Sequence, residues 1–173
     1  MSETEEIIND LQTSNVRYAA ENASILPKHI SGQKPNVAVL TCSDSRVIPE
    51  YIFQREIGDI FTVRVAGNIA IDSCVLASLE YAVTHLKIKL LIILGHTHCG
   101  AVAAAEKTQE SWGFLDEIRH SFTKDENHSL ANIKYQLEMI PKRSKIISKA
   151  IKKEELRLIG AIYNLENGLV EFL

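Results

Sequence analysis

Short apolar runs, bounded by residues that break regular structure, recur along the chain. Three of them, at 36–41, 60–66 and 90–95, are rich in aliphatic residues and lack the alternation of a half-exposed strand. Such runs are typical of strands buried on both faces of a parallel sheet. A fourth run at 156–163 is followed by Asn167 and Gly168, a dipeptide that predicts a type I′ hairpin turn. The last strand is therefore expected to be antiparallel to the fourth.

Segments with helical periodicity separate these runs. Residues 3–24 and 71–86 carry apolar side chains at helical spacing, and further helical patterns lie at 130–139 and after Pro141. The ring of Pro141 suits the first turn of a helix. Strands that alternate with helices predict an α/β fold, with a mostly parallel central β-sheet, an antiparallel edge strand and flanking helices. Between 101 and 128 the pattern is mixed, and we expect Trp112 to be a packing residue and 123–128 a surface loop.

Length and composition indicate one globular domain over residues 1–173, with 1–26 as an N-terminal helical arm. Hydrophobic residues make up 46% of the chain and charged residues 24%, the usual balance of a soluble protein. The formal net charge is −3, and no run of Lys or Arg is dense enough to follow a phosphate backbone. The composition therefore argues against a nucleic acid partner.

The beginning of the chain, MSETEEIINDLQ, is acidic and lacks the basic and apolar regions of a secretory signal. The longest apolar run, at 90–94, is far shorter than the roughly 20 residues of a membrane-spanning helix. Three cysteines in such a chain are typical of a reducing compartment. We therefore expect a cytoplasmic protein with no membrane partner.

Two of the predicted strands run directly into metal-binding side chains. Cys42 follows the first strand, and His96 and Cys99 follow the third. Because the carboxyl ends of parallel strands meet at one edge of a sheet, these side chains are expected to converge. Two thiolates and one imidazole are the ligand set of a catalytic zinc site with an open position. Cys42 alone, or His96 and Cys99 alone, would be weak evidence for a metal site, since a single cysteine is often an inert packing residue. His98 is either a rival ligand or a solvent-facing loop residue.

Asp44 and Arg46 stand two positions apart on the loop that follows Cys42. This spacing allows a bidentate ion pair that keeps the carboxylate ionised. The carboxylate could accept a hydrogen bond from zinc-bound water or occupy the fourth ligand position itself; the alternative is a surface ion pair of little consequence. Zinc with an open position lowers the pKa of bound water to about 7, which predicts hydroxide attack on a small electrophilic carbon.

The motif Cys42-Ser-Asp-Ser-Arg46, together with Gly95-His-x-x-Cys-Gly100, resembles the β-class carbonic anhydrases. The resemblance extends from about residue 30 to the C-terminus and includes 63–68 and 160–173. It implies one Zn²⁺ per subunit, held by Cys42, His96 and Cys99, with Asp44 and Arg46 as the catalytic dyad. The implied activity is the reversible hydration of CO2 to bicarbonate and a proton, by zinc hydroxide attack.

Further positions are similar to the plant-like branch of that family. Gln33, nine positions before Cys42, would donate a hydrogen bond to CO2 or bicarbonate, and the other implied substrate-binding residues are Phe61, Ala66, Tyr81 and Gly100. His98 or Tyr81 could pass the proton outward. Val39-Leu40-Thr41 stands where a second branch has the Trp-x-Gly of its bicarbonate-regulated site, so water rather than Asp44 is expected as the fourth ligand at neutral or higher pH.

The resemblance also implies a homodimer or a higher homo-oligomer. The active site would lie at the subunit interface, and the N-terminal helix would pack on a partner subunit. An alternative within the same family is a hydrolase of carbonyl sulfide or carbon disulfide, which would use the same zinc site. A structural or regulatory zinc protein is a third possibility, but Gln33 and the Asp44–Arg46 dyad are not needed merely to hold metal.

Two other residues carry expectations about packing. Cys74 stands among apolar residues of a predicted helix, so we expect it to be a packing residue and not a metal ligand. Arg64 lies within an apolar strand, where a charge needs a partner, so a carboxylate or carbonyl is expected beside it.

Overall fold

The computed structural model describes residues 2–108, 113–124 and 127–173. The chain divides into two compact units, Met1–Gln33 and Lys34–Leu173, and the single domain expected for 1–173 stays a prediction. Trp112 and part of the loop expected at 123–128 lie outside the described residues. Among the described residues, no helix has the length and apolarity required to cross a membrane.

The N-terminal unit consists of helix α1 (Glu3–Glu21) and a short 3₁₀ turn, η1 (Leu26–His29). A capping box begins α1. The Ser2 side chain accepts a hydrogen bond from the backbone N–H of Glu5, and the Glu5 side chain accepts one from the backbone N–H of Ser2. Asn22 caps its other end. The helix expected at 3–24 is therefore confirmed, although none of the residues of α1 is buried.

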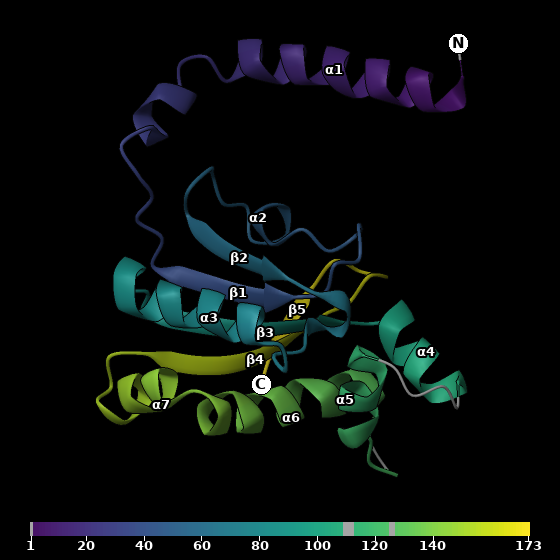
Figure 1. Cartoon of the computed structure of the whole chain (residues 1–173), viewed down its shortest axis with the longest axis vertical. Coiled ribbons are helices and arrows are strands. Elements are labelled where there is room, and N and C mark those ends of the chain that lie inside the picture. Colours follow the sequence, from purple (N-terminus) through teal and green to yellow (C-terminus); the bar gives the residue numbers. More distant parts are fainter. Residues whose placement is uncertain (1, 109–112, 125–126) are drawn as a thin grey trace. The chain divides into compact units, whose positions relative to one another are not determined.

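The second unit is built on a five-stranded sheet of order β2-β1-β3-β4-β5 (Figure 1). Neighbouring strands among β1 to β4 are parallel, and β5 is antiparallel to β4, which confirms the predicted fold class. Thr41, at the end of β1, pairs with Arg64 of β2 and with Leu94 of β3, so these three strands end at one edge. The strands are β1 (Val37–Thr41), β2 (Ile60–Arg64), β3 (Leu90–His96), β4 (Arg157–Tyr163) and β5 (Val170–Phe172).

Helices cover both faces of this sheet and the edge where the strands end (Figure 1). On one face, the core contains side chains of α3, α6 and α7. On the other, residues in and after α2 pack on β1 and β3. Beyond the strand ends, α4 and α5 enclose a smaller apolar cluster that includes Cys42 and Cys99. The helices and turns are α2 (Pro49–Ile52), η2 (Ala66–Asn68), α3 (Ser73–Tyr81), η3 (Ala82–Leu86), α4 (Gly100–Lys107), α5 (Phe114–His120), α6 (His128–Arg143) and α7 (Lys145–Lys152).

The connection between β4 and β5 is a hairpin, but the predicted type I′ turn is wrong. That turn needs a positive φ at two consecutive residues; Gly168 has a φ of 73°, whereas Asn167 does not adopt a positive φ. A longer loop is closed instead, because the N–H of Asn164 donates to the carbonyl of Leu169 at 2.9 Å. The Asn167 side chain also accepts from the Leu169 N–H at 2.9 Å.

Two expectations about single residues are also wrong. Pro141 does not begin a helix but lies inside α6, near its end, and Ser144 caps the separate helix α7 by accepting from the N–H of Ile147. Cys74 is exposed rather than packed, because it lies in the first turn of α3 while the buried residue of that helix is Leu79.

Candidate metal centre

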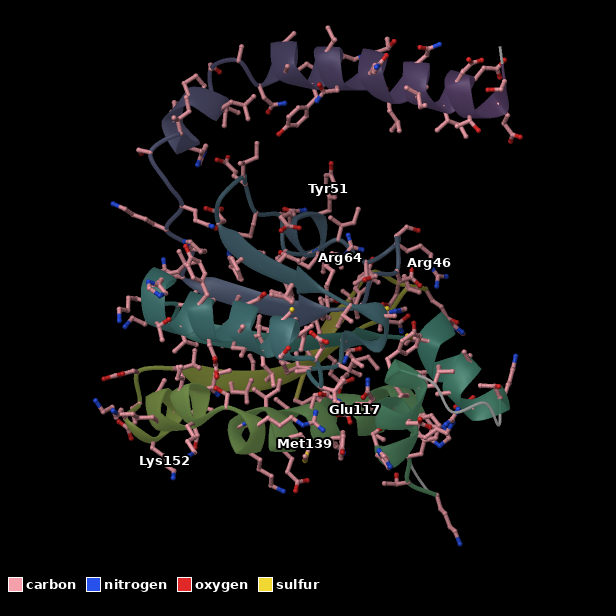
Figure 2. The ribbon with its side chains drawn as sticks, viewed as in Figure 1. Arg46, Tyr51, Arg64, Glu117, Met139 and Lys152 are labelled. Carbon is pink, nitrogen blue, oxygen red and sulfur yellow. The ribbon has the colours of Figure 1, made fainter. Side chains whose placement is uncertain are left out.

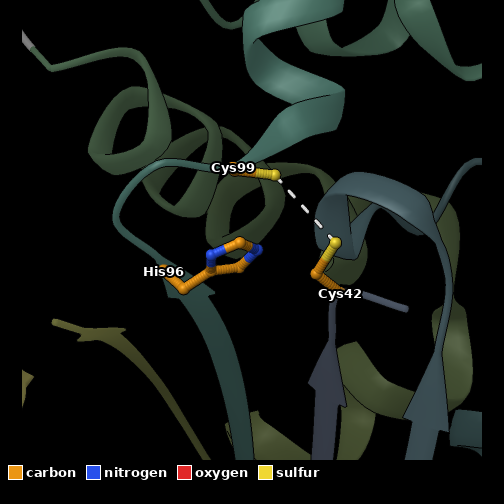
Figure 3. Close-up of side chains that lie close together, drawn as sticks. All are labelled: Cys42, His96 and Cys99. Carbon is orange, nitrogen blue, oxygen red and sulfur yellow. Dashed lines mark hydrogen bonds between the residues drawn. The ribbon is translucent and has the colours of Figure 1, made fainter. Parts of the chain in front are cut away.

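Three side chains from separate segments converge beyond the strand ends (Figure 3). Cys42 directly follows β1, His96 is the last residue of β3, and Cys99 directly precedes α4. One ligand atom from each residue lies within 4.8 Å of the other two, and the two Sγ atoms are 4.0 Å apart. All three residues are buried. The convergence expected from the strand ends is therefore present.

The imidazole of His96 is the clearest sign that this group fits a metal ion. Its Nδ1 atom lies 2.8 Å from the carbonyl oxygen of Thr97, so Nδ1 carries the proton and donates it. Nε2 is buried and has no hydrogen-bond partner among the described residues. A buried polar atom without a partner costs about 1–3 kcal/mol, and a metal ion would satisfy it. Two thiols beside an imidazole suit Zn²⁺, with one coordination position left open.

The thiols of Cys42 and Cys99 influence each other's pKa. The contact with Cys99 lowers the pKa of Cys42 to about 4 although burial opposes the shift, and the hydrogen bond from the Gly67 N–H acts in the same direction. The same contact raises the pKa of Cys99. The two sulfur atoms, 4.0 Å apart, are close enough to share a proton, and a cation bound between them would take the place of that proton.

Asp44 forms the bidentate pair that the spacing predicts with Arg46, which is labelled in Figure 2. Nε of Arg46 donates to Oδ1 of Asp44 at 2.9 Å and Nη2 donates to Oδ2 at 2.7 Å. These bonds hold the pKa of the Asp44 carboxyl well below its usual range. Oδ2 also lies 3.8 Å from Nε2 of His96. The carboxylate is thus fixed beside the nitrogen that would bind a metal ion.

Arg64 supports the same loop from the neighbouring strand (Figure 2). Its Nε donates to the carbonyl of Cys42 at 3.3 Å and its Nη2 donates to the carbonyl of Asp44 at 2.7 Å. The expectation that a carbonyl or carboxylate accompanies this charge is confirmed. Arg64 therefore restrains the backbone on both sides of Ser43.

His98 is not part of the converging group. Its side chain is exposed, and its Nε2 lies 3.2 Å from a carboxylate oxygen of Glu166. Its carbonyl accepts a hydrogen bond from Arg46 Nη2 at 3.3 Å. The interpretation of His98 as a solvent-facing loop residue is confirmed.

The other expected site residues lie in several places. Phe61 and Tyr81 are neighbours, with ring centroids 6.1 Å apart, and Phe61 pairs with Ala38 near the beginning of β1 rather than at its end. Ala66 begins η2 and is partly buried, and Gly100 begins α4 directly after Cys99. Gln33 belongs to the N-terminal unit. Their roles in substrate binding stay predictions.

Sequence reasoning missed one residue that contacts the site directly. The backbone N–H of Gly67 donates to Sγ of Cys42 at 3.3 Å. Gly67 has a φ of 73°, a conformation that favours glycine. The signal available in the sequence was a glycine directly after an apolar strand.

Residues 37–170 match the family model described as carbonic anhydrase. The crystal structure of the β-carbonic anhydrase CafA of Aspergillus fumigatus has the same fold, with a TM-score of 0.80 and 28% sequence identity. This chain belongs to the β-carbonic anhydrase family. The resemblance based on the two motifs is therefore confirmed.

The similarity extends over most of each relative. The match with CafA covers 99% of this chain and 91% of that one. Carbonic anhydrase 2 of Mycobacterium tuberculosis is 34% identical over 154 residues, which cover 80% of this chain and 74% of the relative. One of two tetrameric β-carbonic anhydrases from Sordaria macrospora has a TM-score of 0.78 and 26% identity, covering 98% of this chain and 96% of its own.

Proposed function

We propose that this chain catalyses the reversible hydration of CO2 to bicarbonate and a proton, with one Zn²⁺ held by Cys42, His96 and Cys99. One observation carries the assignment of the ligands. The buried Nε2 of His96 has no hydrogen-bond partner among the described residues and faces two thiols within 4.8 Å. Membership of the carbonic anhydrase family supports CO2 as the substrate.

A bound zinc ion would supply a Lewis acid that lowers the pKa of a water molecule to about 7. Residues of the chain would hold and orient this ion. Cys42 and Cys99 would bind as thiolates and His96 through Nε2, which leaves one coordination position for water or substrate. The ring proton of His96, on Nδ1, is donated to the Thr97 carbonyl and fixes the direction of the ring.

Asp44 would orient the attacking water. Arg46 contacts both carboxylate oxygens, and Oδ2 keeps room to accept a further hydrogen bond on the side of His96. An ionised carboxylate accepts but does not donate, so it would direct the water's proton toward Oδ2 and its lone pair toward CO2. Because both carboxylate oxygens are held by Arg46, this geometry supports water rather than Asp44 as the fourth ligand.

The substrate pocket would combine apolar and hydrogen-bonding residues. CO2 carries no net charge, so we propose that Ala66 holds it by apolar contact beside Gly100. Phe61, which lies near the beginning of β1, and its neighbour Tyr81 would reach the pocket from a partner subunit. Gln33 would donate to a substrate oxygen.

We further propose that the pocket is completed across a subunit interface of a homo-oligomer. Two observations support this assembly. A structural relative from Sordaria macrospora is tetrameric, and α1 exposes several apolar side chains that a partner subunit could cover. Large apolar groups left in water favour association. The exposed apolar residues of α1 are Ile7, Ile8, Leu11, Val16 and Tyr18.

Stopped-flow CO2 hydration, measured together with zinc content, tests the proposed activity. The purified protein should contain about one zinc per subunit, lose hydration activity when a chelator removes it, and recover when zinc is restored. Carbonyl sulfide is assayed alongside with the same samples. Zinc-loaded protein that hydrolyses carbonyl sulfide but leaves CO2 hydration at the buffer rate would overturn the proposal.

The cytoplasm is the proposed location. Cys42, Cys74 and Cys99 are all free thiols, which supports a reducing compartment. Immunodetection in fractionated cells tests this, and recovery of the protein outside the cytoplasmic fraction would contradict it.

A further inference from the structure

Hydrogen-bonded polar side chains, most of them buried, connect α5 and α6 next to the metal centre. Glu117 of α5, labelled in Figure 2, is only 2% exposed. It is paired with Arg143, whose Nη2 donates to Oε2 at 3.0 Å and whose Nη1 donates to Oε1. Gln136 and Asn132, one turn apart on α6, are fully buried. We call Glu117, Asn132, Gln136 and Arg143 the α5–α6 network.

The charge of Glu117 fixes the direction of every hydrogen bond in this network. A carboxylate only accepts, so Nε2 of Gln136 must be the atom that faces it, at 3.3 Å. The same Nε2 donates to Oδ1 of Asn132 at 3.4 Å. The remaining atom of each amide is thereby assigned: Gln136 Oε1 must accept, and Asn132 Nδ2 must donate.

Both of these atoms form hydrogen bonds with the backbone that follows β2. Asn132 Nδ2 donates to the carbonyl of Gly67 at 2.7 Å, and Gln136 Oε1 accepts from the N–H of Ala70 at 2.9 Å. Arg143 Nη1 donates to the Ala70 carbonyl at 3.2 Å. The segment from Gly67 to Ala70 is therefore held at both ends by side chains of α6.

Within this segment, Gly67 is the residue that contacts the metal centre. Its N–H donates to Sγ of Cys42 at 3.3 Å, while its own carbonyl is held by Asn132. On another side, Ile118 of α5 packs so closely that a Cβ on Gly67 would lie 2.5 Å from Cδ1. Contacts from α5 and α6 thus restrain Gly67 in addition to the hydrogen bond of its own turn, in which the Asn68 N–H donates to the Val65 carbonyl at 3.0 Å.

We propose that the α5–α6 network positions the metal ligand Cys42, by holding Gly67 so that its N–H donates to the thiolate. This inference rests on the zinc site proposed above. A hydrogen bond to a ligating atom orients it and adjusts the charge it shares with the metal, and losing such support typically costs roughly 10–100-fold in metal affinity or activity.

Stability alone is a poor explanation for the network. Buried ion pairs often stabilise a fold no better than apolar residues of similar volume, because the charges lose their hydration. The network instead satisfies three backbone groups of one segment whose position matters to Cys42. A positioning role also predicts an effect that a purely structural role lacks, namely a change in the metal–thiolate bond.

The test compares Asn132→Ala with Ser144→Ala in the full-length protein. Ser144 is a matched control because it is 1% exposed and donates a hydrogen bond to Glu80 at 2.6 Å, but among the described residues no hydrogen bond joins it to the segment from Gly67 to Ala70. Three properties are measured: Zn²⁺ affinity by competition with a chromophoric chelator, the thiolate-to-metal charge-transfer band of the Co²⁺-substituted protein, and the melting temperature of the metal-free protein.

Both variants should melt at lower temperature, since each loses a buried hydrogen bond. Only Asn132→Ala should bind Zn²⁺ roughly 10–100-fold more weakly and shift the charge-transfer band. Equal Zn²⁺ affinities and identical Co²⁺ spectra in the two variants would overturn the inference. Should Asn132→Ala fail to fold, Glu117→Gln decides by the same criteria, because it removes the charge that directs the network and keeps the side-chain shape. Wild-type protein that binds no Zn²⁺ would overturn the proposed function instead, and the two failures are thus distinguishable.

Discussion

Oδ2 of Asp44 lies 3.8 Å from Nε2 of His96, and that imidazole is fully buried while the carboxylate is partly exposed. The two atoms approach each other without forming a hydrogen bond, since Nδ1 of His96 carries the ring proton. A metal ion bound to Nε2 would therefore have the Asp44 carboxylate beside it. The metal site and the acceptor that would orient its water are thereby placed by two different strand ends.

Replacing Asp44 by Asn should separate catalysis from metal binding. Asn has the same shape but presents a donor as well as an acceptor, and it loses the charge that pairs with Arg46. CO2 hydration should fall by roughly 10²-fold or more, the usual contribution of a positioned proton acceptor, while zinc content stays at about one per subunit. Asp59→Asn, at an exposed carboxylate on the loop before β2, is the control. An Asp44→Asn enzyme with wild-type kcat/KM would remove Asp44 from the mechanism.

His96, the last residue of β3, and His98, in the loop that follows, should behave differently. His96→Ala removes the buried nitrogen that has no protein partner, and its zinc affinity should fall by more than the roughly 10–100-fold that a supporting residue costs. His98→Ala removes an exposed ring whose contact is Glu166, and its zinc affinity should stay close to that of the wild type. Chelator competition on both variants measures this. Loss of zinc from His98→Ala alone would reverse the ligand assignment.

Much of the fold could be predicted because apolar runs and helical periodicity are local signals. The errors arose where other contacts override the preference of a single residue or dipeptide. Pro141 looks like a helix start, yet α6 continues past it to Arg143, whose guanidinium is held by Glu117 of α5. Likewise, Asn167 and Gly168 resemble a two-residue turn, but a hydrogen bond between Asn164 and Leu169 closes a longer loop.

The metal centre was predictable for a similar reason. Cys42, His96 and Cys99 each lie at or near a strand end, so their convergence follows from sheet topology. The α5–α6 network was not, because its links join residues far apart in the chain: Asn132 and Gly67 are 65 positions apart. In sequence, Asn132 and Gln136 look like the solvated face of a helix, and only the fold reveals that they are buried.

Substitutions at Gly67 and Gly168 measure how much the close packing of α5 on Gly67 restricts that position. Both have a φ of +73°, but a Cβ would lie 2.5 Å from Ile118 Cδ1 at Gly67 and would meet nothing within 4 Å at Gly168. Gly168→Ala should therefore cost only the conformational strain, about 1–2 kcal/mol of unfolding free energy. Gly67→Ala should cost about 1–3 kcal/mol more, because of overpacking. Urea denaturation measures both.

A second substitution tests whether Ile118 causes the difference. Ile118→Val removes the Cδ1 atom that a Cβ on Gly67 would strike. Combined with Gly67→Ala, it should recover most of the additional loss. If the double variant is as unstable as the sum of the two single variants, the clash with Ile118 is not the reason that position 67 requires glycine.

The apolar side chains of α1 should contribute to oligomer assembly. Leu11 is 63% exposed and shares one side of the helix with Ile7 and Tyr18, whereas Thr13 lies on the opposite side. Burying a leucine contributes about 1.5–3 kcal/mol, so Leu11→Glu should weaken subunit association by roughly 10–100-fold. Thr13→Glu introduces the same charge and should not. Light scattering coupled to size-exclusion chromatography over a dilution series measures the mass of each variant. Equal dissociation of the two variants would mean that α1 does not pack on a partner through its apolar side.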